Sequence, residues 1–182
     1  MVIIMEKRIA KVNVSSAGGT ASKNSKTHKI TLPGSWLAIL GINENNRELE
    51  LEFDGRQIIL SRSTSGEEFA VRGLEQKHDV RLFLLYDCNV LCTTIYADFT
   101  VKRIVAENHL NDHIKTAFGN NTLPSWDDFQ IFLQERCIPK ERAGLREYME
   151  AIDVSEYDPV EIIRKTAGRM AEDNQWLEIV KL

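Results

Sequence analysis

Hydrophobic and polar residues alternate over much of the first third of this chain and recur at helical spacing in its last third. Residues 6–14 end in an alternation that places Ala10, Val12 and Val14 on one side, which predicts a strand. Residues 29–32 predict a second, short strand. The residues between them, 15–28, are small or polar, so we expect a mobile loop there.

A short helix and a hairpin are predicted next. Pro33 suits the first position of a helix, and Gly41 stands where that helix would end. Residues 48–53 alternate without a break, the Asp-Gly pair at 54–55 is a strong two-residue turn signal, and residues 57–60 return as the partner strand. The sequence up to residue 62 therefore predicts the order strand, strand, helix, strand, strand.

The rest of the chain predicts a small antiparallel meander followed by a helical bundle. Residues 63–79 hold few apolar residues at any regular spacing, so we expect a connector. Residues 80–106 predict three antiparallel strands with turns at 87–89 and 97–98. Apolar residues at helical spacing then predict helices over 110–118, 126–133 (with Ser125 as its cap), 140–152 and 159–167, and a strand or helical turn over 176–180.

Length and composition fit an α+β protein of two parts. The chain has 182 residues, of which 43% are hydrophobic and 27% charged, values ordinary for a globular protein. We expect domains over 1–62 and 80–182, joined by 63–79. No apolar stretch is long enough to span a membrane, and the segment before Glu6 is too short for a signal peptide, so we expect a cytoplasmic protein with no membrane partner.

The net charge of −4 conceals an uneven distribution. Residues 1–43 carry a net charge of +5, residues 44–62 carry −2, and residues 63–182 carry −7. A basic end on an acidic body favours an anion-binding face near the N-terminus. The alternatives are a solvated surface of mixed charge, or a basic strand that balances the acidic strand 48–54 within the fold.

The N-terminal part is small for an independent fold. It has roughly 55 residues, and a unit of that size with few bulky apolar side chains seldom forms a core alone. A second copy would supply the missing surface, so we expect a homodimer.

The residues of this part carry a resemblance to a known family. Lys29-Ile-Thr-Leu-Pro-Gly-Ser-Trp-Leu-Ala-Ile-Leu-Gly-Ile42 is followed by Leu49-Glu-Leu-Glu-Phe-Asp-Gly-Arg-Gln-Ile-Ile-Leu60. These residues resemble the AbrB/MazE/SpoVT swapped-hairpin family. The pattern of that family is a basic residue, a strand ending in Leu-Pro, a short helix, Leu-Gly-Ile, an alternating strand, a turn and a closing strand. The likeness covers residues 7–62, about a third of the chain.

The resemblance implies an intertwined homodimer with a swapped-hairpin β-barrel that binds duplex DNA. The family includes transition-state regulators and antitoxins that repress their own operon. Its basic residues fall on Arg8, Lys11 and Lys29 of this sequence. Lysines neutralise phosphates, and asparagine pairs with adenine. The candidate DNA-binding residues are Arg8, Lys11, Lys23, Asn24, Lys26, His28 and Lys29.

Two departures from the family pattern keep a second interpretation open. Leu37 and Ala38 occupy a stretch where family members often carry arginines, and the loop 15–28 is longer than that of simple members. The preferred prediction is a sequence-specific transcriptional regulator, in one version an antitoxin whose acidic C-terminal module binds a toxin. The alternative is a protein-interaction module that has lost DNA binding.

A third hypothesis is a small metal-dependent enzyme. Cys88 and Cys92, then His109 and His113, loosely resemble a Cys2His2 zinc site. An apolar strand surrounds Cys92, and buried free cysteines are common. The sequence has no P-loop, Gly-x-Ser-x-Gly or His-Glu-x-x-His motif. We therefore expect no enzymatic activity, no metal and no cofactor. The three cysteines do not form a disulfide framework.

Overall fold

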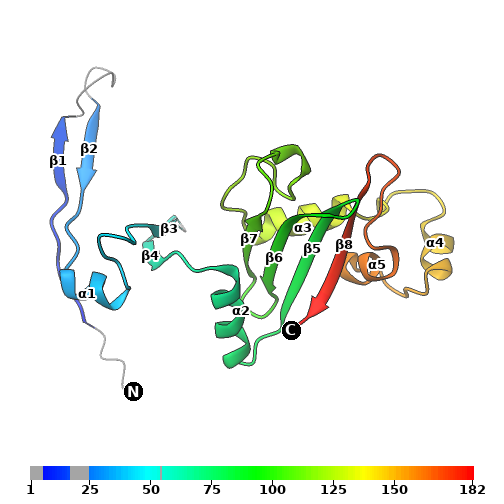
Figure 1. Ribbon diagram of the computed structural model, residues 1–182, viewed down its shortest axis with the longest axis horizontal. Coiled ribbons are helices and arrows are strands. Elements are labelled where there is room, and N and C mark those ends of the chain that lie inside the picture. Colours follow the sequence, from blue (N-terminus) through cyan, green and yellow to red (C-terminus); the bar gives the residue numbers. More distant parts are fainter. Residues whose placement is uncertain (1–5, 17–24, 54) are drawn as a thin grey trace. The chain divides into compact units, whose positions relative to one another are not determined.

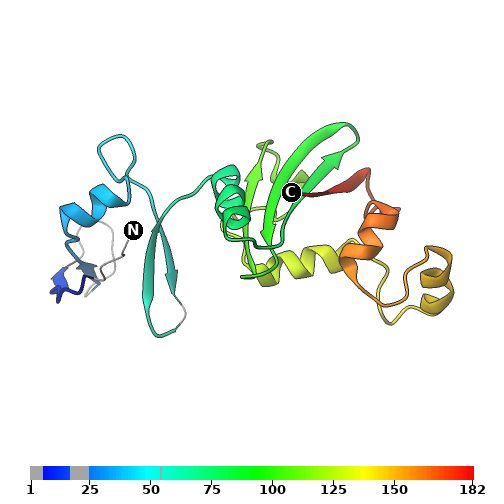
Figure 2. The same cartoon turned by 90° about the horizontal axis from the view of Figure 1, so that it is seen from below.

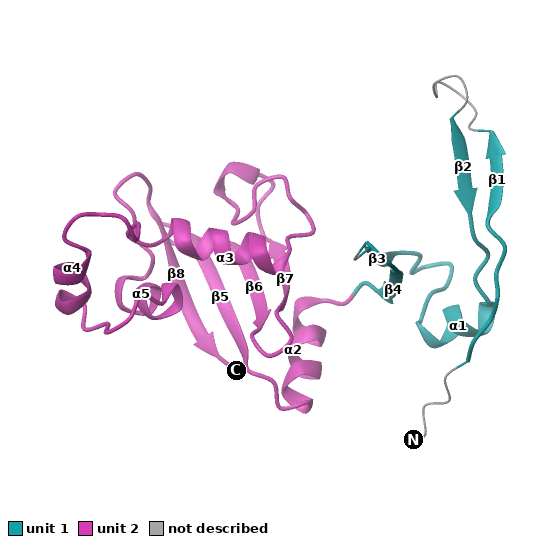
Figure 3. Ribbon diagram, turned by 180° about the vertical axis from the view of Figure 1, so that it is seen from behind, with its two compact units in different colours: residues 1–63 teal, residues 64–182 magenta. Residues whose placement is uncertain are grey.

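The structure is a computed structural model that describes residues 6–16, 25–53 and 55–182. The chain divides into two compact units (Figure 3): unit 1 comprises residues 1–63 and unit 2 comprises residues 64–182. Lys23, Asn24 and Asp54, which the sequence analysis singled out, lie outside the described residues.

Unit 1 consists of two antiparallel hairpins with a short helix between them in the chain (Figure 1). Strand β1 (Asn13–Ser16) pairs with β2 (Lys26–Lys29), and β3 (Leu49–Phe53) pairs with β4 (Ile58–Arg62). Helix α1 (Gly34–Ile39) starts directly after Pro33 and is followed by Gly41 at a φ of +72°. The element order predicted for this part is confirmed.

The paired strands of the first hairpin include residues that the alternation assigns to the loop. Strands were expected over 6–14 and 29–32 with a loop over 15–28, but Ser15 pairs with Thr27 and Ser16 with Lys26. The loop prediction is therefore wrong at both ends. Ladder hydrogen bonds are made by backbone groups, so short polar residues can pair without any bulky side chain.

Unit 1 has no core of its own. None of its described residues is buried, and several of its large apolar side chains face solvent. Ile9 is 102% exposed, Ile39 84% and Phe53 71%. The α1 helix likewise has no buried residue. The described part of unit 1 thus forms secondary structure in which no residue as a whole is buried.

Unit 2 is built on a four-stranded antiparallel sheet with the order β7-β6-β5-β8 (Figure 1). The strands are β5 (Val80–Asp87), β6 (Val90–Asp98), β7 (Arg103–Asn108) and β8 (Gln175–Lys181). The predicted meander is confirmed. The C-terminal segment, for which the sequence predicts a strand or a helical turn, is a strand that pairs with β5.

Two of the helices of unit 2 share a core with one face of this sheet. Helix α3 (Trp126–Glu135) runs across one face (Figures 1 and 2), where Phe129 meets Phe83 of β5 edge to face at 5.1 Å between ring centroids. Helix α5 (Pro159–Thr166) contributes Ile162 and Ile163 to the same core. The 3-10 helix η1 (His113–Lys115) and helix α4 (Leu145–Ala151) lie in the long segment between β7 and β8. Because α3 and α5 share their core with the sheet, these helices do not form the separate helical bundle that was expected.

The segment 63–79 is not a connector but contains helix α2 (Gly66–Glu75). Its buried residues, Gly66, Ala70 and Gly73, are small, which is why apolar spacing did not reveal it. The Gly73 side of α2 comes so close to the sheet that a methyl group there would lie 2.6 Å from a Val80 methyl. Ser65 caps the helix by accepting a hydrogen bond from the Glu68 backbone N–H.

Three other predictions differ from the structure. Residues 110–118 form only η1, because Asp112 caps one short turn and the Ala117 N–H donates to the buried Thr93 hydroxyl instead of continuing a helix. The predicted helix 140–152 is shortened to α4, which starts after Gly144 at a φ of +79°. The second turn of the meander lies beyond Asp98 rather than at 97–98.

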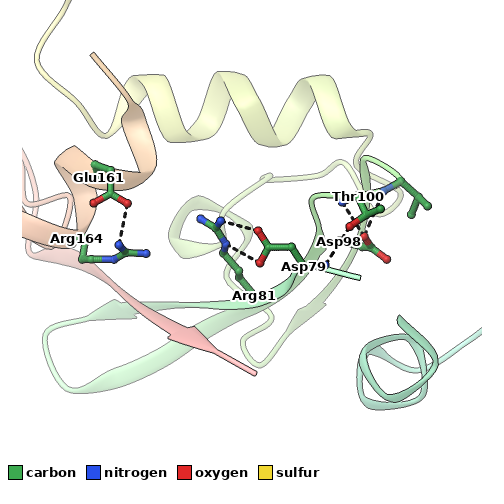
Figure 4. A network of polar contacts seen from close by, with 7 residues as sticks. Asp79, Arg81, Asp98, Thr100, Glu161 and Arg164 are labelled. Atoms are coloured by element: carbon green, nitrogen blue, oxygen red, sulfur yellow. Dashed lines mark hydrogen bonds and ion pairs between the residues drawn. The ribbon is translucent and has the colours of Figure 1, made fainter. Parts of the chain in front are cut away.

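A polar network fixes the sheet end near residues 79 and 98 (Figure 4). Buried Asp98 accepts hydrogen bonds from the backbone N–H groups of Thr100 and Val101, and its other oxygen lies 2.7 Å from His78 Nδ1. The Arg81 guanidinium donates to both oxygens of Asp79, which lowers the pKa of that carboxyl group. These contacts join the β6–β7 turn to the segment that follows α2. The network therefore has a structural role in unit 2.

The architecture is mixed α+β with small antiparallel sheets. The two hairpins of unit 1 are separate two-stranded sheets, and no closed barrel occurs among the residues that the structure describes in this single chain. Every helix in the described ranges is too short or too polar to span a membrane.

Candidate nucleic-acid interface

The β1–β2 hairpin presents basic side chains on both of its faces. Lys26 and His28 stand opposite Ser16 and Val14, so these four side chains share one face. Lys29 stands opposite Asn13 on the other face. Lys26, His28 and Lys29 are all exposed, because nothing in the described part of unit 1 covers the hairpin.

Arg8 lies beside an aromatic residue that comes from α1. Its guanidinium carbon is 5.6 Å from the centre of the Trp36 ring, and its Nη2 is 3.5 Å from Glu6 Oε2. The Trp36 indole N–H donates to the same Glu6 oxygen at 2.8 Å. An exposed ion pair of this kind contributes about 0–1 kcal/mol, so a phosphate can replace Glu6 as the partner of Arg8 at little cost.

An open cavity of about 430 Å³ runs along the base of the hairpin. It is lined by residues 8–11, 30–33, Asn13 and Trp36, which brings Arg8 and Lys11 to one hollow. The described residues from 6 to 36 include five Lys or Arg and one carboxylate, that of Glu6. The surface around the cavity is therefore positive, and a two-stranded ribbon has dimensions that the DNA major groove admits.

The structure thus describes five of the seven predicted DNA-binding residues. Arg8 and Lys11 line the cavity, Lys26 and His28 share a face of the hairpin, and Lys29 lies on the opposite face. Sequence reasoning missed Trp36 and Glu6 as partners of Arg8. Trp36 is half-buried and hydrogen-bonded to Glu6.

The four metal-ligand candidates are not brought together. Cys92 is buried and its thiol donates to the Val90 carbonyl, and burial raises the pKa of that thiol. His109 Nε2 is engaged with the Thr94 hydroxyl at 2.8 Å, while Cys88 lies in the β5–β6 turn and His113 in η1. Within the described ranges, no group of three His, Cys, Asp or Glu side chains is placed to hold a metal ion.

Comparison of the chain with protein-family models, with curated proteins and with solved structures gives no match.

Proposed function

We propose that this chain is a homodimeric transcriptional regulator that binds a specific duplex DNA site through unit 1. The observation that carries the proposal is the combination of a basic hairpin with a unit that buries none of its described side chains. The first feature suits a polyanion, and the second calls for a second chain.

The exposed apolar residues of unit 1 support the dimer. Leu51 and Phe53 of β3 and Ile58 and Ile59 of β4 leave 45–71% of their surface in water. Burying apolar surface contributes about 25 cal/mol per Å², so these residues favour association. Interlocking of the two hairpins with those of a second copy, as in the swapped-hairpin family, would give the barrel that one chain does not form.

The basic residues support DNA as the ligand. A dimer presents two copies of Arg8, Lys11, Lys26, His28 and Lys29. Phosphate contacts by lysine and arginine release counterions and supply affinity, while base-edge contacts supply specificity. Unit 2 then serves as a partner-binding module, and in the antitoxin version of the proposal its acidic residues face a toxin.

The first experiment is selection from a random-sequence duplex library, followed by affinity measurements at several salt concentrations. We expect one two-fold-symmetric site and a steep dependence of log K on log salt. The double variant Lys26→Gln/Lys29→Gln removes up to four phosphate contacts from a dimer, which would reduce the magnitude of the slope by up to about 4.

The matched control is Lys102→Gln/Lys165→Gln, which removes the same charge from exposed positions of unit 2. It should leave the slope unchanged. Equal effects of the two double variants would mean that binding follows net charge alone. No binding by the wild type even at low salt would favour the interaction module that has lost DNA binding.

The dimer is tested separately by sedimentation equilibrium. We expect the mass of two chains, and we expect Phe53→Ser to shift the equilibrium toward one chain because it removes an exposed apolar ring from β3. Ile114→Ser, which removes a 92% exposed side chain from unit 2, is the control. A wild-type chain that stays monomeric at every concentration would overturn the dimer.

A further inference from the structure

Unit 2 has an open cavity of about 650 Å³ beyond the C-terminal end of α3. Three segments that are distant in sequence line it. They are residues 137–139, 141 and 142 after α3, Tyr148 of α4 and residues 169–172 before β8. Cavities of about 300–1,000 Å³ hold ligands the size of a drug molecule.

The walls of this cavity are held by polar contacts behind it. Arg136 is 9% exposed, and its Nη1 donates to Asp173 at 2.8 and 3.1 Å. Its Nη2 donates to Gln175, so the end of α3 is tied to the segment that leads into β8. On the other side the Tyr157 hydroxyl donates to the Ile138 carbonyl at 2.8 Å. The cavity therefore lies between two anchored segments.

Four charged side chains line the cavity: Glu141, Arg142, Arg169 and Glu172. All four are exposed at the rim of the cavity, and none of them forms an ion pair or a side-chain hydrogen bond with another described residue. Arg169 makes only a cation–π contact, at 5.4 Å from the Trp176 ring centre. Other charged residues of unit 2 do form ion pairs, among them Arg164 with Glu161 at 2.7 Å and Lys115 with Asp87 at 2.6 Å.

The remaining lining is mostly apolar. It consists of Ile138, Pro139, Met170 and Ala171, together with the 4% exposed Cys137. The phenol of Tyr148 adds a hydroxyl group that bonds to no described residue. Two cations, two carboxylates and an apolar surface thus meet around one hollow.

We propose that this cavity binds a short peptide of two or three residues with free ends and apolar side chains. Equal numbers of cations and carboxylates favour a ligand that carries both charges over a simple anion or cation. Arginine pairs with a carboxylate through two parallel hydrogen bonds, and the glutamates suit an ammonium group. The ligand's side chains then cover the apolar residues. This site lies in unit 2 and does not depend on the DNA-binding role of unit 1.

The ligand is tested by titration calorimetry and by thermal unfolding of the full chain. The probes are Leu-Leu, N-acetyl-Leu-Leu, Leu-Leu amide and free leucine. Leu-Leu should bind and raise the unfolding temperature. Each capped form should bind at least about tenfold more weakly, because it loses the charge-assisted hydrogen bonds made by one end of the ligand.

Variants assign the charged groups. Arg142→Gln should weaken binding of Leu-Leu about tenfold or more and should have little further effect on the amide, which lacks the carboxylate. Glu172→Gln should likewise weaken binding of Leu-Leu about tenfold or more. It should have little further effect on N-acetyl-Leu-Leu, which lacks the ammonium group. Arg146→Gln is the control, because Arg146 is an exposed α4 residue paired with Glu150 and lies outside the lining.

Four outcomes overturn the proposal. The first is no saturable binding of Leu-Leu in the millimolar range. The second is binding that neither cap changes. The third is a loss in Arg142→Gln that the Arg146→Gln control reproduces. Free leucine that binds as tightly as Leu-Leu would exclude the peptide and assign the cavity to a single amino acid.

Discussion

Unit 1 and unit 2 differ in where their apolar side chains go. All the buried hydrophobic residues of the described chain belong to unit 2, where the sheet and helices α3 and α5 enclose them. The strands of unit 1 also alternate apolar and polar residues, yet none of the described residues of unit 1 is buried. Regular secondary structure and a closed core are therefore separate properties, and only unit 2 has both.

The difference has a thermodynamic consequence. A unit with its own core unfolds at a temperature that does not depend on protein concentration, whereas a unit stabilised by a second chain becomes more stable as concentration rises. The two units should therefore respond differently to dilution. Mutations that affect one unit give a direct way to test this comparison.

The largest effect is expected from Phe129→Ala. Phe129 is fully buried and meets Phe83 at 5.1 Å and Trp126 at 5.4 Å. Truncating a buried phenylalanine costs about 3–5 kcal/mol, so the unfolding transition of unit 2 should move to much lower denaturant at every protein concentration. Urea unfolding followed by circular dichroism measures the change.

Phe53→Ala is the counterpart in unit 1. It should leave the transition of unit 2 in place and weaken only the transition that depends on concentration. If Phe53→Ala destabilises the chain as much as Phe129→Ala at high dilution, where dimers dissociate, the contrast between the units is wrong.

Substitutions at two glycines, one in each unit, should change stability by smaller amounts. A Cβ at Gly73 of α2 would lie 2.6 Å from Val80 and 3.2 Å from Asp98, so Gly73→Ala should force α2 off the sheet and cost about 1–3 kcal/mol. At Gly34 of α1 nothing lies within 4 Å, and Gly34→Ala should be neutral or stabilise by up to about 1 kcal/mol. Thermal unfolding of the two variants gives both values. A larger loss at Gly34 would indicate a close contact made by a second chain.

Several elements of the fold were predictable because local chemistry fixes them. Ser125 predicted the start of α3, and the structure contains a complete capping box of Ser125 and Asp128. Helix α2 shows the opposite case, because its inward residues are two glycines and an alanine, which no apolar pattern reveals. The Ser65–Glu68 pair was the signal that would have found it. Residues 110–118 have helical spacing, but the tertiary bond from Ala117 to Thr93 prevents the helix.

The candidate sites were less predictable than the elements. Basic residues identified the hairpin, since charge is visible in the sequence, but the Glu6–Trp36 contact that adjoins Arg8 joins residues 30 positions apart. The cavity of unit 2 gathers residues from three separate segments. Neither spacing nor composition relates position 142 to position 169, so only the folded chain shows that their side chains line one cavity.

The smallest expected effect concerns the first residues of helices α3 and α1. In α3 the Ser125 hydroxyl accepts from the Asp128 N–H at 3.1 Å, whereas α1 has no side-chain cap. Ser125→Ala should therefore cost about 1 kcal/mol. Ser35→Ala in α1 should change stability by less than about 0.5 kcal/mol. Chemical denaturation of both variants checks the pair, and equal losses would show that the cap contributes nothing specific to unit 2.

The same cap predicts a dependence on pH. The backbone N–H and then the hydroxyl of Ser125 donate to Asp128, which lowers the pKa of that carboxyl below its ordinary value of 3.8. A lowered pKa in the folded state contributes stability that is present above the ordinary value and is lost as the pH falls through the lowered one. Asp128→Asn removes the charge, so the wild type should be more stable than the variant at neutral pH and should lose part of that advantage in acid. A difference that stays constant from neutral pH down to acid would assign the loss to packing at the helix start rather than to the charge on Asp128.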